Sequence, residues 1–224
     1  MRNILYNYPQ PKEPRYLEEN FRSFNDRIIA SYKDKRFYHG SKSTGYGGYK
    51  YDGRWKQVAE NCIELYNLND NSNILHINCD FGFLLSDLKN MNKNFRINGT
   101  ENSYYAMENL MNNIKDDVIY TRPQDINFEE NMFDLTIVLG VVYTLTLPDA
   151  INLLKKITFI TKNNNSFITL ATYEDEEELK LFNSWTLGGN LCLKREEWKM
   201  IFKETNYKGD CLFVDSNYLN LKFK

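Results

Sequence analysis

The sequence predicts an α/β fold with a mostly parallel sheet, helices on both faces, an N-terminal extension and a C-terminal antiparallel hairpin. The first indication is that short apolar runs alternate with amphipathic helical segments from about residue 54 onward. The second is the segment His76–Gly82, which closes one apolar strand and opens a helix. Such alternation requires parallel strands joined by helices that cross over the sheet.

The composition suits one sizeable domain and excludes several classes of protein. The chain has 224 residues, of which 42% are hydrophobic and 15% aromatic, enough for a single core. A formal net charge of -2 gives no reason to expect a nucleic-acid partner. No apolar run is long enough for a signal peptide or a membrane span, so we expect a cytoplasmic protein. The four cysteines are scattered and predict neither disulfides nor a metal site.

The first 53 residues are expected to form an extension to a domain of residues 54–224. A helix is predicted over Leu17–Tyr32, followed by the Gly/Tyr stretch Gly45–Gly53. Arg54 begins a further helix, because the apolar residues after it recur at helical spacing.

The domain itself is expected to alternate strands and helices. Strands are predicted at Asn73–Ile77, Phe95–Thr100, Val118–Tyr120, Phe133–Leu139 and Ser166–Thr172, and helices at Phe83–Met91, Tyr104–Ile114, Pro148–Ile160, from Glu174, and at Arg195–Lys203. The acidic run at the start of the Glu174 helix is interpreted as a solvated first turn, where carboxylates complement the helix dipole. Cys211–Asp215 and Tyr218–Lys224 are predicted to form the antiparallel hairpin around Ser216 and Asn217.

The turn at His76–Gly82 is the main candidate for a ligand site. A turn from strand to helix presents backbone N–H groups and a positive helix end to a ligand. Asn and Asp tolerate the left-handed conformation best after glycine, so Asn78 and Asp80 are expected to keep the turn's shape. The alternative is a loop that still folds but binds nothing.

Two further segments are placed to join this site. Glu101 ends the second strand 19 residues after Gly82, where an acid that pairs with ribose hydroxyls is expected; the alternative is a solvated loop carboxylate. The loop after Arg122 follows the third strand and is placed to edge an adenine. Gly140 and Tyr143 follow the fourth strand, at the sheet edge where ligands bind.

These parts together resemble a known family. A strand followed by D-x-G-C-G-x-G, an acidic second-strand end and F-D-L-(T/V)-I aligns with His76–Gly82, Glu101 and Phe133–Ile137. The order is similar to that of class I S-adenosylmethionine-dependent methyltransferases, with their Rossmann-like sheet. The stretches Tyr49–Trp55 and Glu196–Trp198 resemble small bacterial members associated with surface-polysaccharide and capsule clusters.

The resemblance implies S-adenosylmethionine as the cofactor, with roles for particular residues. The Asn78–Gly82 backbone would face the methionine part, Glu101 the ribose, and Gln124 with Asp125 the adenine. His76 stands where the family often has an acid, and Asp80 would either favour the cofactor's ammonium or repel its carboxylate. The full implied cofactor-binding set is His76, Asn78, Cys79, Asp80, Gly82, Glu101, Asn102, Gln124, Asp125 and Leu139.

The resemblance also implies a lid and an acceptor. The Gly/Tyr stretch would fold over the site, where aromatic faces stabilise a sulfonium; otherwise it is an ordinary surface linker. The implied acceptor is a small molecule, such as a sugar- or phosphate-containing precursor of a surface polysaccharide. The candidate acceptor-contacting residues are Tyr143, Tyr49, Asp52 and Arg54.

Two other functions are weighed against methyl transfer. One is a catalytically inactive protein of this fold that acts as partner or regulatory subunit of an active relative, in a homodimer or a heterodimer with a related methyltransferase. The replacements at His76, Asn78 and Asp80 motivate it. The other is a nicotinamide-dependent enzyme, which the glycine spacing and the expected terminal hairpin disfavour.

Overall fold

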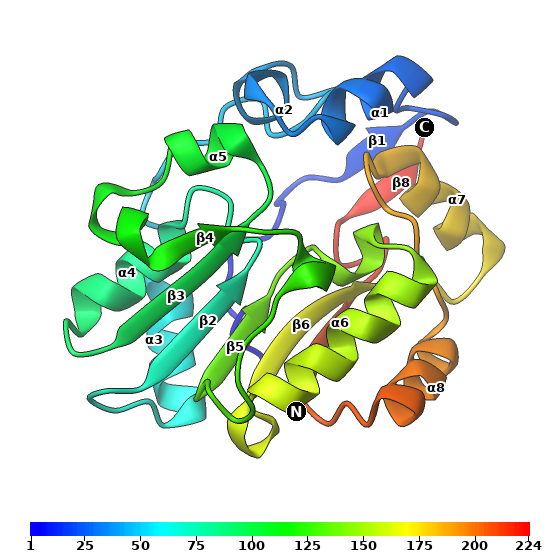
Figure 1. Cartoon of the computed structure of the whole chain (residues 1–224). Helices are drawn as coiled ribbons and strands as arrows, with labels where there is room; N and C mark the ends of the chain where they lie inside the picture. The colour runs from blue at the N-terminus through cyan, green and yellow to red at the C-terminus, as the bar shows by residue number, and fades with distance from the viewer.

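The computed structural model describes all 224 residues and contains a six-stranded parallel sheet in the order β4-β3-β2-β5-β6-β7 (Figure 1). The strands are β2 (Asn73–Ile77), β3 (Arg96–Glu101), β4 (Val118–Tyr120), β5 (Leu135–Val138), β6 (Ser166–Ala171) and β7 (Asp210–Val214). The chain builds outward from β2 to β4 and then returns to the other side of β2 with β5. This reversal opens a crevice at the carboxyl ends of β2 and β5, where α/β sheets bind ligands.

Helices cover both faces of this sheet, as the sequence predicts (Figure 1). The helices α3 (Trp55–Tyr66) and α4 (Phe83–Met91) pack on one face, and α6 (Leu147–Ile160) and α8 (Arg195–Thr205) on the other. Successive strand residues point to opposite faces. Accordingly Ile74 lies in the core with α3 and α4, whereas Leu75 lies in the core with α6 and α8.

The sequence pattern predicts the bounds of some strands and helices accurately and those of others poorly. The predicted bounds of β2, β4 and α4 are confirmed to the residue. The helix expected over Tyr104–Ile114 is wrong in length, because α5 covers only Tyr104–Glu108 and a 3-10 helix follows at Asn112–Asp117. The helix stops because the Met111 N–H donates to the Phe81 carbonyl at 3.0 Å, which draws the chain toward the loop before α4.

The predicted C-terminal antiparallel hairpin is wrong. The strand β7 pairs in parallel with β6, and β8 (Leu221–Phe223) pairs in parallel with β1 (Arg15–Leu17) in a separate two-stranded sheet. The cause is the turn after β7, in which the Asp215 carboxylate accepts from the Tyr218 N–H at 2.7 Å and Asn220 takes a φ of 53°. This turn carries the chain away from the main sheet, so the hairpin no longer argues against a dinucleotide enzyme.

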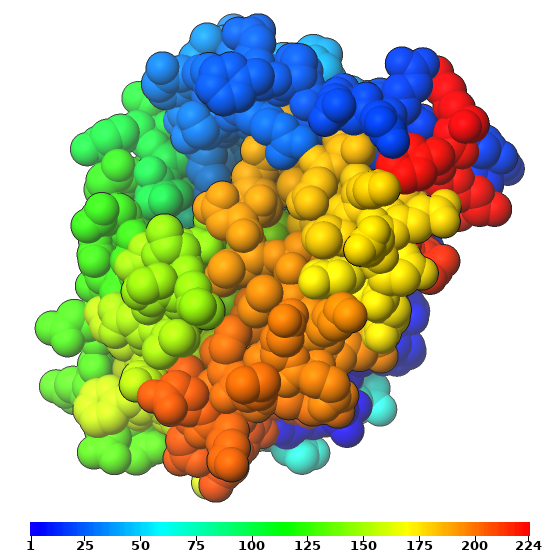
Figure 2. Space-filling view, turned by 90° about the vertical axis from the view of Figure 1, so that its right-hand side faces the viewer, coloured from blue at the N-terminus to red at the C-terminus, as the bar shows by residue number.

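The N-terminal region is more irregular than predicted. The helix expected over Leu17–Tyr32 is wrong, because Leu17 belongs to β1 and α1 covers only Phe24–Ser31 behind a Ser23 capping box. A second short helix, α2 (Lys35–His39), follows, and α7 (Glu176–Trp185) packs against β1 and β8. Figure 2 shows this N-terminal region, in blue, against the C-terminal residues in red.

The domain division at residue 53 stays a prediction, although the first residues contribute to the main core. Ile4 is fully buried with residues of α3 and α4, and the Asn61 side chain donates to its carbonyl at 2.8 Å. No helix combines the length and apolar character needed to cross a membrane.

Candidate functional site

Two adjoining cavities occupy the crevice at the carboxyl ends of β2 and β5. The first, of about 430 Å³, extends toward the N-terminal residues and α3. The second, of about 730 Å³, extends toward the loops after β4 and β5 and toward α7. Both volumes lie in the usual range for ligand sites. The residues that line both cavities, and so form their junction, are Tyr46, Asn78, Asp80, Leu139 and Gly140.

The floor of the crevice is the turn between β2 and α4. Asn78, Asp80 and Gly82 take φ angles of 57°, 51° and 73°, so the expectation that Asn and Asp adopt the left-handed conformation here is confirmed. Thr100 on β3 holds the turn: its hydroxyl accepts from the Asn78 N–H at 3.1 Å and its carbonyl from the Cys79 N–H at 2.9 Å.

Gly82 supports the turn from beneath and lines neither cavity. A Cβ at this position would lie 2.1 Å from the Ile114 Cδ1 atom. A side chain at this position would therefore take a strained backbone conformation and would force Ile114, in the 3-10 helix after α5, to shift.

Glu101 anchors the floor and is fully buried. One carboxylate oxygen accepts from the Asp80 N–H, and the other accepts from the N–H groups of Asn102 and Ser103, each at 2.8 Å. Burial, and then the nearby Asp80 carboxylate, raise the pKa of Glu101. This side chain lines neither cavity, so its contacts in the closed structure are with the backbone of the loop.

An aromatic cover, residues 33–53 including α2, lies over this floor. Its centre is Tyr38, whose fully buried hydroxyl donates to the Asp80 carboxylate at 2.8 Å. The Tyr38 ring stacks on Phe81 and Tyr105, with centroids 4.7 and 5.8 Å away. Burial, and then the charges of Asp80 and Glu101, raise the pKa of Tyr38, so it stays a phenol. The sequence analysis missed Tyr38, and only the aromatic run Phe37-Tyr38-His39 hints at it.

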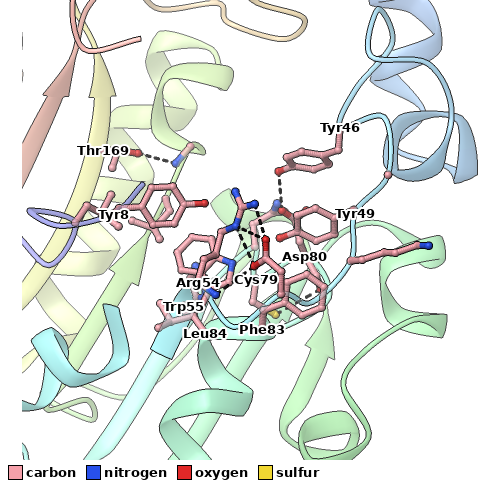
Figure 3. Close-up of a pocket in the computed structure, with 18 residues that line it drawn as sticks. Tyr8, Tyr46, Tyr49, Arg54, Trp55, Cys79, Asp80, Phe83, Leu84 and Thr169 are labelled. Atoms are coloured by element: carbon pink, nitrogen blue, oxygen red, sulfur yellow. Dashed lines mark hydrogen bonds and ion pairs between the residues drawn. The ribbon is translucent and has the colours of Figure 1, made fainter. Parts of the chain in front are cut away.

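The Gly/Tyr stretch contributes lining residues to both cavities. The Tyr46 hydroxyl donates to the second Asp80 oxygen at 3.0 Å (Figure 3). Its ring stacks on Tyr49 with centroids 4.3 Å apart, and Tyr49 stacks on Phe83 at 4.9 Å. Tyr46 therefore lies at the junction of the two cavities, hydrogen-bonded to the floor.

Three buried polar atoms of cavity-lining residues have no partner within the protein. They are His76 Nδ1 at the first cavity, Asn78 Oδ1 at the junction of the two cavities, and Asn102 Oδ1 at the second. Burial lowers the pKa of His76 to about 4, so its imidazole is neutral near pH 7. Buried polar atoms are normally hydrogen-bonded, so these three mark places where a bound polar ligand fits.

The far end of the first cavity contains a closed ion pair. The Arg54 guanidinium binds the Asp52 carboxylate through two nitrogens, at 2.8 Å from Nε and 2.5 Å from Nη2. Arg54 lines the first cavity with this partner already beside it, and its role toward an anionic acceptor stays a prediction. Tyr8 and Trp55, which the sequence analysis did not select, complete this wall with ring centroids 5.1 Å apart (Figure 3).

The second cavity brings together Tyr143, Asn102 and Gln124. Tyr143 packs against Phe182 with ring centroids 6.0 Å apart, and burial raises the pKa of its phenol. Asp125 lines neither cavity, because its carboxylate pairs with Arg122 at 2.6 Å on the surface. Of the residues chosen from the sequence, all but Gly82, Glu101 and Asp125 line one of the two cavities.

Comparison with known proteins places this geometry in a familiar fold. No family model and no curated protein matches the sequence. Solved structures do match. One is a Haloferax volcanii protein described as a putative methyltransferase, in complex with the Trm112 methyltransferase activator, with 16% identity over 69% of this chain and 72% of that chain and a TM-score of 0.52. Another is a Bacillus halodurans protein described as a putative methyltransferase, with 9% identity over 66% of this chain and 67% of that chain and a TM-score of 0.52. The chain has the class I methyltransferase fold.

That fold supports more than one activity. The [4+2]-cyclase SpnF matches over 88% of this chain and 64% of its own length, with 13% identity and a TM-score of 0.53. At these identities the likeness shows the fold alone, and function has to be argued from the site.

Proposed function

We propose that this protein transfers a methyl group from S-adenosylmethionine to a small-molecule acceptor. The observation that carries the proposal is the crevice between β2 and β5, floored by a left-handed turn and lined by three unpartnered buried polar atoms. Nucleotide ligands of α/β sheets bind at such a reversal of strand order. The fold shared with methyltransferases supports S-adenosylmethionine as that nucleotide.

The cofactor would lie across both cavities. Its adenine fits beside Gln124 and Asn102, and its methionine part fits above the turn, toward His76. Glu101 remains the proposed ribose residue. Because the Glu101 carboxylate is fully buried, the aromatic cover has to move before a ribose can reach it.

The acceptor would occupy the part of the second cavity walled by Tyr143, Phe182 and Trp185. Methyl transfer is an in-line displacement, so alignment and exclusion of water supply much of the acceleration. Tyr143 stays protonated and serves to orient the acceptor by a hydrogen bond. Lys33, which lines the same cavity and has no ion-pair partner, suits an acceptor that carries phosphate, as a polysaccharide precursor does.

Calorimetric titration with S-adenosylmethionine and S-adenosylhomocysteine tests the proposal. We expect micromolar binding of both, and a loss of about 1–3 kcal/mol in binding free energy for Glu101→Gln, the range for a hydrogen bond to a charged group. A folded wild-type protein that gives no heat up to millimolar ligand would contradict the function. Unchanged affinity in the variant would contradict only the ribose assignment.

One observation favours a second candidate, a catalytically inactive partner subunit. Both oxygens of Glu101 and both oxygens of Asp80 are already engaged by groups of the protein itself. If the cover stays in place, these contacts hold the site together without a nucleotide and leave no carboxylate oxygen for one. The same titration separates the two candidates, since this one predicts no binding by a well-folded protein.

A further inference from the structure

Asp80 occupies the junction of the two cavities. Its side chain lines both, so a ligand that reaches from Gln124 in one cavity to Tyr8 in the other has to pass it. The turn fixes this position, because Asp80 is held in the left-handed conformation and its N–H donates to Glu101 at 2.8 Å.

The Asp80 carboxylate carries a negative charge with no cationic partner. Both oxygens accept hydrogen bonds from phenols, Tyr38 at 2.8 Å and Tyr46 at 3.0 Å. The ion pairs of the protein involve other acids, and none includes Asp80. The second acid in the first cavity, Asp52, is neutralised by Arg54. Of the two acids that line the cavities, Asp80 is therefore the one without a cationic partner.

The surroundings of this charge also favour a cation. Tyr46, Tyr49 and Phe83 form a continuous stack beside Asp80, with centroid separations of 4.3 and 4.9 Å (Figure 3). Aromatic faces attract cations, and more strongly where water is excluded. A carboxylate next to such faces is suited to a compact positive group.

We propose that Asp80 is the counter-charge for the sulfonium of S-adenosylmethionine and makes the site select this cation over its neutral thioether product. The inference rests on the proposed function. The sulfonium lies in the middle of the cofactor, between nucleoside and amino acid, and Asp80 lies in the middle of the crevice. The amino and carboxyl groups of the cofactor would lie farther into the first cavity, beyond Asp80.

The selectivity is measured as the ratio of the dissociation constants of S-adenosylhomocysteine and S-adenosylmethionine. Loss of one close charge contact at an intermediate dielectric changes binding by about tenfold or more. We expect the wild type to prefer S-adenosylmethionine by about tenfold. Asp80→Asn keeps an oxygen for the tyrosines and should weaken S-adenosylmethionine about tenfold, with a change in S-adenosylhomocysteine of about twofold at most.

Two controls accompany this variant. Glu130→Gln removes one exposed charge away from the crevice and should change neither constant. The wild type alone gives an independent measurement should Asp80→Asn fold poorly, because its preference for S-adenosylmethionine over S-adenosylhomocysteine is measured without any variant.

The outcomes separate this inference from the proposed function. If both nucleosides bind but Asp80→Asn weakens them equally, or if the wild type binds the thioether as tightly as the sulfonium, Asp80 is not the counter-charge and the proposed function stands. If neither nucleoside binds to folded wild type, both proposals fall together.

Discussion

The floor and the cover of the crevice differ in how they are built. The floor consists of β2, the turn at residues 78–82 and α4. It is held by backbone hydrogen bonds, by buried Glu101 and by one hydrophobic core on each face of the sheet. The cover, residues 33–53, is held mainly by aromatic stacking and by two phenol hydroxyls on Asp80. This difference predicts that the cover opens at a lower free-energy cost than the floor.

Removal of the Glu101 carboxylate should destabilise the floor more than any other substitution considered below. Glu101→Ala leaves the N–H groups of Asp80, Asn102 and Ser103 without their acceptor, and buried unmet donors are costly. We expect the free energy of unfolding to fall by about 3–5 kcal/mol, measured by urea titration. Glu129→Ala, on an exposed loop, is the control. A loss below 1 kcal/mol would mean that the floor does not depend on this anchor.

The buried histidine of the floor predicts a pH dependence. The pKa of His76 falls to about 4 in the folded protein from an ordinary value of 6.5. Between these two pH values the imidazole of His76 binds a proton more strongly in the unfolded chain than in the folded protein. The contribution of neutral His76 to stability is therefore fully present above pH 6.5 and is lost as the pH falls toward 4. The loss attributable to His76 should approach about 3 kcal/mol.

Comparison of wild type with His76→Gln isolates this contribution, because the amide does not titrate. The difference between their urea midpoints should shrink steadily from pH 7 to pH 4. Parallel pH profiles for the two proteins would show that His76 titrates normally and is not buried as the structure has it.

Gly82 tests the packing beneath the turn. Gly82→Ala places a methyl 2.1 Å from Ile114 at a φ of 73°, so we expect a loss of about 2–3 kcal/mol in unfolding free energy. Gly188→Ala is the matched control, since a Cβ there meets no atom within 4 Å. Equal losses of unfolding free energy for the two substitutions would contradict tight packing beneath the turn.

Most of the floor and little of the cover could be predicted from the sequence. The bounds of β2 and α4 follow from signals within the segment itself, an apolar run and a polar turn that ends in Gly82. Asn78 and Asp80 were recognised from their own conformational preference. In contrast, β1 and β8 are three residues each and exist because they pair with one another across almost the whole chain.

The residues of the site differ in the same way, since some could be predicted from their place in the sequence and others depend on long-range contacts. Position after a strand end predicted Tyr143 and the loop after Arg122 at the crevice, because parallel strands bring their carboxyl ends together. Asn102 and Gln124, which also line the crevice, were implied by the family resemblance. The role of Tyr38 depends on a fold-back over Asp80 that no local pattern encodes. The ion pair between Arg54 and Asp52 was not predicted, although the two residues are only two positions apart.

The smallest predicted effect concerns the cover alone. Tyr38→Phe keeps the stacked ring and removes only the hydroxyl that binds Asp80, so unfolding free energy should fall by about 1 kcal/mol. Hydrogen exchange should show more: amides of residues 37–51 should exchange several-fold faster, while those of β2 and α4 keep the wild-type rate. Tyr32→Phe, on an exposed ring outside the stack, should leave both regions unchanged. If the floor and the cover accelerate together in Tyr38→Phe, the two open as one unit, and a nucleotide could then enter only by global unfolding rather than by movement of the cover.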